Sequence, residues 1–582
     1  MKVLLAAVNA KYIHSCLAVY TLQAYARKWG RPGLAKEVET AEYTINQPEG
    51  EILGDIYRRR PDVLCFSCYI WNWETIQNLV REAKKVLPGT RIWLGGPEVS
   101  YDAEKVLRLL PQTDGVMRGE GEATFLELLE ALDTGEGELP DLERISGITW
   151  RDREEIRKNP DRPVLDMNRL PFIYQEENIE SFAHKILYYE SSRGCPFSCS
   201  YCLSSVEKCL RFRDTELVKQ DLDFFLKHKV PQVKFVDRTF NCRHGHALEI
   251  WNYLAGHDNG VTNFHFEISA DLLTEEELSL LETMRPGLVQ LEIGVQSTNS
   301  RTIREIRRSM DLEKVRAGVE RVNAAGNIHQ HLDLIAGLPF EDYESFRRSF
   351  NQVFAMKPEQ LQLGFLKVLK GSYMEERKED YQLVYQSRPP YEVLYTKWLG
   401  YDEVLRLKDI EEILEVYYNS SQFEMTLPRA IKGFPDAFAF FETLADWYRQ
   451  KGMMDQSHSR IQRYELLLSF LKEREPERQE EYVQLLTLDF YLRENAKNRP
   501  AFAGKDRTEK AWARIFYDQE EETHRYLPGY PEADSRLLRK MTHIETFTYD
   551  VLGNMEGKTL RILFDYQNRN PLNHQASIVV IE

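Results

Sequence analysis

Short apolar runs alternate with helix-like segments along most of this chain, and this alternation limits the possible folds more than any other feature. The first run, at 2–8, is continuously apolar, which is typical of a parallel strand covered on both faces. In the middle of the chain, apolar candidate strands lie at 186–191, 232–236, 264–269, 288–295, 328–336 and 361–366. Consecutive strand–helix units of this kind predict a partial (β/α)6 barrel, in which functional groups gather at the carboxyl ends of the strands.

A separate alternation occupies the beginning of the chain, with apolar runs at 2–8, 62–67, 91–94 and about 114–118. It predicts an α/β, Rossmann-like, open doubly wound domain. Composition and pattern then divide the chain into a first domain at 1–135, a linker rich in Gly, Pro and charge at 136–185, the barrel at 186–375, and a mainly helical domain with terminal strands at 376–582. A small hairpin is expected in the linker near 146–156.

Bulk properties exclude several classes of protein. A length of 582 residues requires several domains. The formal charge of −16 argues against nucleic acid as a partner, because binding to phosphates needs clustered Lys and Arg. No apolar stretch reaches the roughly 18 residues of a membrane helix. The first apolar run is broken by Asn9 and Lys11, which favours a buried strand over a signal peptide. Eight cysteines without an export signal indicate a reducing cytoplasm.

Three cysteines stand directly after the first strand of the predicted barrel. Cys195, Cys199 and Cys202 lie within eight residues, so their thiolates can converge on one metal centre. Thiolates are the usual ligands of iron–sulfur clusters, and three of them on a four-iron cluster leave one iron open to another molecule. The alternative is a structural zinc site, but such sites usually have a second cysteine pair elsewhere, which Cys209 and Cys242 do not form.

The triplet resembles the Cys-x₃-Cys-x₂-Cys motif of the radical S-adenosylmethionine (SAM) superfamily. Residues 291–297 and 333–339 are similar to the fourth- and fifth-strand motifs of the subgroup containing the oxygen-independent coproporphyrinogen oxidase. The resemblance covers about 186–370 and implies a [4Fe–4S] cluster and bound SAM. It also implies five contacts with SAM: Tyr201 against the adenine, Gln296 and Ser297 facing the ribose, Glu267 at the ribose or amino group, and Arg308 at the methionine carboxylate.

Some of these residues have plainer interpretations. Arg308 lies in a basic run with Arg304 and Arg307, so a solvated helix face is the alternative. Asp333 either caps a turn or pairs within the barrel. Asp237 resembles an acidic residue of the second strand, and its role stays open.

Ser67, Tyr69 and the pair Gly95-Gly96 follow two neighbouring strands of the first domain. The 25 residues between Tyr69 and Gly95 are close to the spacing at which a serine motif and a glycine pair line the nucleotide-tail pocket of the cobalamin-binding fold. Residues 95–98 and 118–122 resemble cobalamin-dependent radical SAM enzymes with an uncharacterised C-terminal domain. The resemblance implies cobalamin contacts from Ser67, Tyr69, Gly95, Gly96 and Glu120.

Three neighbouring features are interpreted without a ligand. Cobalamin proteins that ligate cobalt through histidine carry Asp-x-His-x-x-Gly, whereas the loop around His14 lacks the Asp and the Gly. We therefore expect cobalt without a histidine ligand, and His14 as a capping or hydrogen-bonding residue. The Gly119-x-Gly121 pattern is flanked by glutamates, which does not suit a dinucleotide pyrophosphate. Cys65 and Cys68 are expected to pack in the core.

Together the resemblances imply an enzyme that cleaves SAM reductively to a 5′-deoxyadenosyl radical and methylates an unactivated carbon with the help of cobalamin. Two alternatives stay open: a cobalamin-assisted rearrangement or cyclisation without methyl transfer, and a non-enzymatic module that senses cobalamin or redox state. The expected partners are a small-molecule or peptide substrate and an electron donor such as flavodoxin or ferredoxin. No nucleic acid and no membrane are expected.

Overall fold

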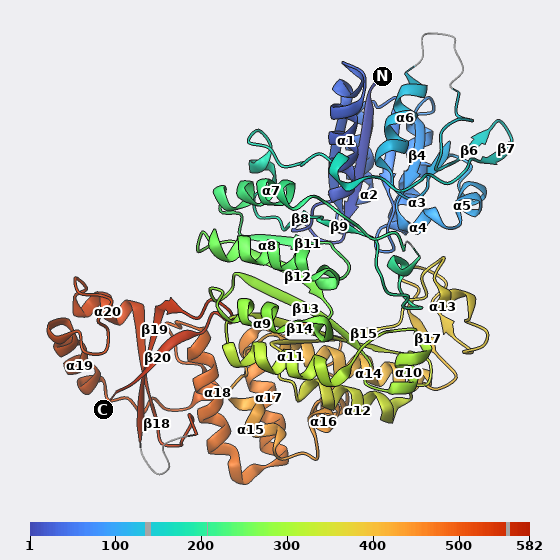
Figure 1. The fold of residues 1–582 in the computed structure, drawn as a ribbon. Helices are drawn as coiled ribbons and strands as arrows, with labels where there is room; N and C mark the ends of the chain where they lie inside the picture. The colour runs from blue at the N-terminus through green and yellow to red at the C-terminus, as the bar shows by residue number, and fades with distance from the viewer. Residues whose placement is uncertain (134–140, 207, 554–558, 582) are drawn as a thin grey trace.

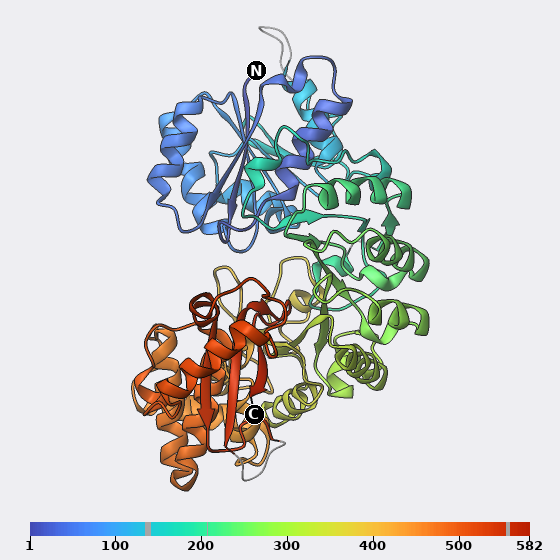
Figure 2. The ribbon, with the colours of Figure 1, turned by 90° about the vertical axis from the view of Figure 1, so that its left-hand side faces the viewer.

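The protein is described by a computed structural model covering residues 1–133, 141–206, 208–553 and 559–581. The chain forms a first α/β domain, a second α/β part built around a parallel sheet, and a C-terminal region of helices with a small sheet (Figure 1). In Figure 2 the first domain and the C-terminal region both extend to the same side of the green second part. The boundary expected between 135 and 136 lies outside the described residues.

The first domain contains a mixed sheet whose strands run in the order β2-β1-β3-β4-β5-β6-β7. The first five strands are parallel, and β6 and β7 are antiparallel. The strands are β1 (Val3–Asn9), β2 (Val38–Thr44), β3 (Val63–Ser67), β4 (Arg91–Gly95), β5 (Gly115–Met117), β6 (Ile148–Asp152) and β7 (Glu155–Lys158). The main helices are α1 (Leu17–Trp29), α2 (Glu49–Arg59), α3 (Trp73–Val86), α4 (Pro97–Ser100), α5 (Ala103–Leu109) and α6 (Glu122–Leu132).

Apolar side chains fill both faces of this sheet, as expected for a doubly wound domain. Every residue of β1 is buried. Neighbouring residues belong to two separate apolar clusters, with Leu64 in one and Cys65 in the other. Cys68 is also fully buried, in the cluster of Leu64, so Cys65 and Cys68 pack in the core as predicted.

Two parts of this domain differ from the prediction. The edge strand β2 was not expected, because only Val38, Ala41 and Tyr43 are buried in it and its sequence is not continuously apolar. The expected hairpin exists as β6 and β7, and it adds to the sheet of the first domain instead of standing alone in a linker.

The second part is built on a six-stranded parallel sheet in the order β15-β14-β13-β12-β11-β8. Its strands are β8 (Leu187–Tyr189), β11 (Gln232–Phe235), β12 (Asn263–Ile268), β13 (Val289–Gln296), β14 (His329–Ala336) and β15 (Gln360–Phe365). The helices between them are α7 (Thr215–Lys227), α8 (His244–Gly256), α9 (Glu275–Glu282), α10 (Ser300–Glu305), α11 (Leu312–Ala325) and α12 (Tyr343–Phe354). Strand order follows chain order throughout, which confirms the partial (β/α)6 barrel.

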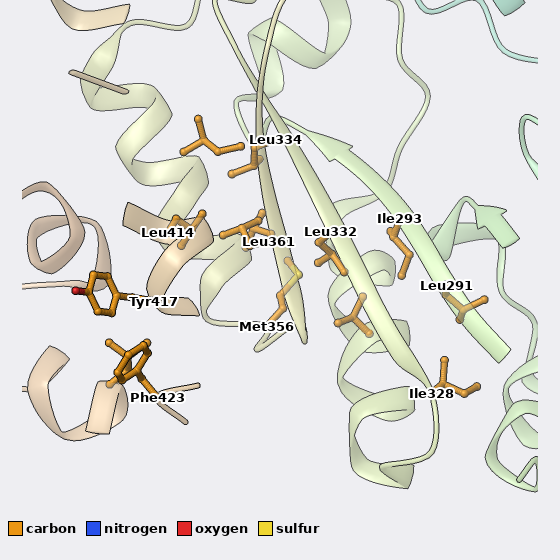
Figure 3. Close-up of a cluster of buried hydrophobic side chains, with 14 of the residues drawn as sticks. Leu291, Ile293, Ile328, Leu332, Leu334, Met356, Leu361, Leu414, Tyr417 and Phe423 are labelled. Carbon is orange, nitrogen blue, oxygen red and sulfur yellow. The ribbon is translucent and has the colours of Figure 1, made fainter. Parts of the chain in front are cut away.

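The two faces of the barrel sheet differ in chemistry. Buried and half-buried residues alternate along β13 and β14, as expected when opposite faces have different environments. Leu291, Ile293 and Leu332 lie on the apolar side, as Figure 3 shows. The same cluster continues into the C-terminal region through Leu414 and Tyr417, near Leu361 of the edge strand β15 (Figure 3). The opposite face carries the polar residues of the same strands.

The C-terminal region is mainly helical with terminal strands, as predicted. Its main helices are α13 (Tyr373–Glu376), α14 (Tyr401–Leu414), α15 (Thr426–Ile431), α16 (Ala437–Gln450), α17 (Arg460–Arg474), α18 (Gln479–Arg493), α19 (Lys510–Thr523) and α20 (Ser535–Met541). The strands are β16 (Val384–Tyr385), β17 (Val393–Tyr395), β18 (Thr542–Phe547), β19 (Leu560–Arg569) and β20 (Ala576–Ile581). Phe438, Phe440 and Phe441 are fully buried, so these aromatic rings form core. Within the described ranges, no helix has the length and apolar character needed to cross a membrane.

Candidate active site

The loop that carries the three cysteines is fastened at its base by Asp237, which follows β11. Asp237 accepts hydrogen bonds from the backbone N–H of Ser191 at 3.0 Å, from the hydroxyl of Ser191 at 2.6 Å and from the hydroxyl of Ser192 at 2.5 Å. Burial raises the pKa of Asp237, and these hydrogen bonds oppose the increase. Because the two serines directly precede Arg193-Gly194-Cys195, Asp237 determines where the cysteine loop begins. The sequence had left its role open.

The cysteine loop is also held at Ser200, by the end of α10 and by α13. The N–H of Ser200 donates to the carbonyl of Ile306 at 2.9 Å, and the N–H of Met374 donates to the carbonyl of Ser200 at 2.9 Å. Cys195 and Cys199 are buried on this loop, whereas Cys202 is partly exposed.

The three thiols lie on one short loop at the mouth of the barrel. In the part of the chain that the structure describes, no three His, Cys, Asp or Glu side chains gather closely enough to hold a single metal ion. In a four-iron cluster each thiolate binds a different iron. The guanidinium of Arg308 lies 3.9 Å from Cys199 Sγ, which places this cation directly beside the cysteine loop.

Strand β13 ends in an irregularity that positions Gln296. The pairing register with β14 shifts between Gly294 and Gln296, and Gln296 adopts a φ of 72°, which is uncommon for a residue other than glycine. A Cβ atom at Gly294 would lie 2.3 Å from Gln296 Nε2, so the Gln296 amide would have to shift if residue 294 carried a side chain. Gln296 Oε1 and Arg308 Nε are buried and have no hydrogen-bond partner. Buried polar atoms are normally paired, and these two therefore fit a polar ligand such as SAM.

Arg308 differs from the rest of its basic run. Arg304 and Arg307 are exposed, whereas Arg308 is half-buried. Its guanidinium donates to the carbonyl of Gly294 and to the hydroxyl of Tyr201, the latter at 3.4 Å. The structure thus brings Tyr201, Gln296 and Arg308 together beside the cysteine loop, where a guanidinium can bind a carboxylate.

The other two residues expected at SAM lie in different environments. Ser297 is fully buried, and its hydroxyl donates to Glu341 Oε1 at 2.6 Å and accepts from the N–H of Asn299 at 3.0 Å. Its hydrogen-bonding capacity is thus used within the protein. Glu267 is half-buried on the polar face of the barrel sheet, 3.8 Å from Lys234 Nζ. Burial and the nearby Glu292 raise the pKa of Glu267.

The polar face of the barrel carries a charged network that sequence reasoning missed. Glu292 lies 2.8 Å from Lys234 Nζ and 3.0 Å from His265 Nε2. Burial alone would raise the pKa of Glu292, but the hydrogen bond from His265 and the charge of Lys234 lower it to about 2. The available signal was a single charged residue at alternate positions of apolar runs, as in Val-Lys-Phe at 233–235 and Leu-Glu-Ile at 291–293.

The carboxyl edge of the first sheet carries all five residues expected at cobalamin, and four of them follow the neighbouring strands β3 and β4. Ser67 and Gly95 are direct neighbours in the register of β3 and β4, and Gly96 and Tyr69 follow them. Tyr69 stacks on Trp71 with ring centroids 4.3 Å apart. Trp71 is 44% exposed, and Tyr12 of the loop after β1 is 67% exposed. Open parallel sheets bind ligands at this edge, and exposed aromatic rings there fit a large, flat macrocycle such as the corrin.

The two glycines at this edge have different roles. Gly96 has a φ of 106°, and a Cβ atom there would lie 2.5 Å from the carbonyl oxygen of Cys68. The backbone alone therefore requires glycine at 96. A Cβ atom at Gly95 would meet nothing closer than Met117 Cε at 3.7 Å. This is an ordinary van der Waals distance, so the fold itself does not require glycine at 95, which leaves a bound ligand as the reason for it.

Glu120 and His14 contact the barrel. Glu120 accepts hydrogen bonds from Arg211 Nη2 at 2.6 Å and from the N–H of Leu165 at 2.7 Å, so its carboxylate is engaged by the protein itself. His14 Nδ1 lies 2.7 Å from the hydroxyl of Tyr188 on β8. His14 is thus a hydrogen-bonding residue, as expected.

The carboxyl edge of the first domain meets both sides of the barrel. On the side of β8, Glu122 pairs with Arg193 at 2.5 Å. On the side of β15, the buried Glu98 pairs with Lys370 Nζ at 2.8 Å and accepts from the hydroxyl of Tyr391. Two ligand-binding edges, each formed by the carboxyl ends of parallel strands, are thereby held against each other.

Comparisons with known families agree with this geometry. Residues 3–129 match the B12 binding domain, residues 189–353 match the radical SAM superfamily, and residues 379–564 match a family described as a protein of unknown function (DUF4080). The chain thus combines a B12-binding domain with a radical SAM domain, the combination found in cobalamin-dependent radical SAM enzymes. The expected cofactors, a [4Fe–4S] cluster, SAM and cobalamin, are confirmed at this level, while the individual contact residues stay predictions.

Individual relatives point the same way. The chain is 29% identical over 311 residues to the 2-(S-pantetheinyl)-carbapenam-3-carboxylate methyltransferase of Streptantibioticus cattleyicolor, covering 49% of this chain and 44% of the relative. It is 27% identical over 386 residues to the cobalamin-dependent radical SAM methyltransferase TokK of Streptomyces tokunonensis, covering 62% and 55%. The chain thus spans about half the length of these relatives. In fold, it is similar to the cobalamin-dependent SAM radical enzyme OxsB, with a TM-score of 0.57 at 15% identity, covering 92% of this chain and 83% of the other.

Proposed function

We propose that this protein transfers a methyl group to an unactivated carbon of a small-molecule or peptide substrate. The observation that carries the proposal is the apposition of two binding edges, one with the unpartnered Gln296 Oε1 and Arg308 Nε and one with exposed aromatic rings around Ser67 and Gly95. Both relatives described above are methyltransferases by name. A reaction that uses both cofactors explains why the chain keeps the two edges together.

When bound, the cofactors would supply the difficult chemistry: one SAM with the reduced cluster would give a 5′-deoxyadenosyl radical, and a second SAM would give up its methyl group through cobalamin and leave S-adenosylhomocysteine. The protein supplies binding, orientation and exclusion of water. Cys195, Cys199 and Cys202 would ligate three irons of the cluster and leave one iron open. Arg308 would bind the methionine carboxylate of SAM, and Gln296 would accept a hydrogen bond through Oε1 from a ribose hydroxyl of SAM.

The same chemistry indicates an electron donor and a cellular location for the enzyme. A one-electron donor such as flavodoxin or ferredoxin reduces the cluster. We place the protein in the cytoplasm, because none of its eight cysteines, all within the described residues, forms a disulfide, as expected in a reducing compartment.

Product analysis tests the proposal. Anaerobically reconstituted protein is incubated with SAM and reductant, and 5′-deoxyadenosine and S-adenosylhomocysteine are quantified. Methylation predicts both products. Formation of 5′-deoxyadenosine alone would favour a rearrangement or cyclisation, and the absence of both would leave the sensing module. Cys202→Ala is expected to abolish both products, whereas Cys209→Ala, a change outside the triplet, is expected to retain them.

A further inference from the structure

Arg193 joins the cysteine loop to the first domain. It lies two residues before Cys195, and its Nε is 2.9 Å from both carboxylate oxygens of Glu190. Its Nη2 donates to Glu122 Oε1 at 2.5 Å, and its Nη1 lies 3.7 Å from Glu120 Oε1. The side chains of Arg193 and Glu122 are only 16% and 7% exposed, so this contact is largely protected from water.

A second arginine contacts the same segment of the first domain. The short strands β9 (Ser192–Arg193) and β10 (Arg211–Phe212) pair antiparallel, with Arg193 directly opposite Arg211. Arg211 donates from Nη2 to Glu120 Oε1 at 2.6 Å and from Nη1 to Glu120 Oε2 at 3.1 Å. Such two-point contacts fix orientation as well as distance, because the guanidinium is planar.

The electrostatics of the network support a firm contact. Burial opposes the charge of Glu120, but the hydrogen bonds from Arg211 and the charge of Arg193 keep the pKa of this carboxyl below its usual value. Glu120 lies between β5 and α6, and Glu122 is the first residue of α6, at the carboxyl edge that also carries Ser67 and Gly95. Arg193 lies at the beginning of the cysteine loop. The network therefore connects the carboxyl edge of the first sheet directly to the cysteine loop.

We infer that Glu120, Glu122, Arg193 and Arg211 form a positioning network that sets the distance and orientation between the corrin and the iron–sulfur cluster. The inference rests on the proposed function in requiring both cofactors in the same molecule. It assigns to Glu120 and Glu122 a role in aligning the domains instead of contact with cobalamin. Loss of the network should leave both cofactors bound but poorly aligned with each other.

The test measures alignment directly. The full chain, loaded anaerobically with cobalamin and cluster, is prepared with Co(II) and the reduced cluster, and pulsed electron paramagnetic resonance (EPR) reports the dipolar interaction between the two. The variants are Glu122→Gln and, from the barrel side, Arg211→Gln. The matched control is Glu127→Gln on the same helix α6, because Glu127 pairs with Arg162, away from the cysteine loop.

We expect a narrow distance distribution in the wild type and in Glu127→Gln, and a broader one in Glu122→Gln and Arg211→Gln. The ratio of S-adenosylhomocysteine to 5′-deoxyadenosine should fall about 10- to 100-fold in the latter two, since displacements near 1 Å have effects of that size. Arg211→Lys, which keeps the charge but loses the two-point contact, should lie between these extremes.

Wild-type dipolar coupling and product ratio in both Glu122→Gln and Arg211→Gln would overturn the inference. Using two variants from opposite domains keeps the test decisive if one of them does not fold. Failure of the proposed function is distinguishable, because it would show in the wild type, as absence of a cofactor or of S-adenosylhomocysteine.

Discussion

The two parallel sheets of this protein use the same strand pattern for different purposes. In the first domain both faces are apolar and covered, and only the carboxyl edge is available to a ligand. In the barrel one face packs against apolar side chains, while the other carries Lys234, His265, Glu292 and further charged groups. A doubly wound sheet thus offers an edge, whereas the partial barrel offers an edge and a polar face. This contrast predicts how substitutions at each place affect stability and ligand binding.

The largest effect on stability is expected at the apolar face of the barrel sheet. Leu332 is fully buried there, and Leu332→Ala should lower the free energy of unfolding by about 3–4 kcal/mol through lost burial and a residual cavity. Chemical denaturation of the anaerobic protein measures this. SAM affinity, determined on the folded fraction, should remain unchanged. A loss of SAM affinity with unchanged stability would contradict the division of the sheet into a structural and a ligand-facing side.

On the polar face, the contribution of Glu292 should depend on pH. Its folded-state pKa of about 2 is below the ordinary 4.5, so the stabilisation is complete above about pH 4.5 and is lost as the pH falls towards 2. Glu292→Gln should therefore cost about 2–3 kcal/mol of unfolding free energy at neutral pH.

Unfolding curves at pH 7 and pH 3 test this dependence. The difference between wild type and Glu292→Gln should shrink at the lower pH. A difference of equal size at both values would show that the charge of Glu292 contributes nothing to stability.

At the barrel mouth the effect should fall on ligand binding. Arg308→Gln is expected to weaken SAM binding by roughly 10- to 100-fold, because a charge-assisted hydrogen bond is worth about 1.5–3 kcal/mol. Equilibrium binding to the reconstituted protein measures it. Arg304→Gln, in the same basic run but exposed, is the matched control and should bind SAM normally. Equal losses of SAM affinity in both variants would show that Arg308 contributes only through its positive charge and not through a direct contact with SAM.

The smallest effects are expected at the carboxyl edge of the first sheet. Of the two adjacent glycines there, one is expected to affect stability and the other cobalamin binding. Gly96→Ala should destabilise the protein by about 1–2 kcal/mol whether or not cobalamin is present, because of its positive φ and the close approach of Cys68. Gly95→Ala should leave stability within about 0.5 kcal/mol and reduce retention of cobalamin. Thermal unfolding and cobalamin absorbance measure the two effects. The reverse pattern would place the ligand at Gly96.

Much of this organisation could be predicted from residues alone. The six barrel strands were found because short apolar segments alternate with helical patterns at regular spacing, and the cysteine triplet was found because its ligands are local in sequence. Long-range pairing was not predictable. The partners of Glu120 and Ser297, Arg211 and Glu341, are 91 and 44 residues away in the chain, so only the fold shows that their side chains are engaged. The charged face was missed because isolated charges inside apolar runs do not reveal their partners.

The most direct test of the central claim is iron binding by the three cysteines. Anaerobically reconstituted wild-type protein should contain about four irons per chain, and the EPR signal of the reduced cluster should change when SAM is added. The variant with Cys195, Cys199 and Cys202 all changed to alanine should hold no cluster while still retaining cobalamin. Iron retained by that variant, or a wild-type cluster signal indifferent to SAM, would contradict the account.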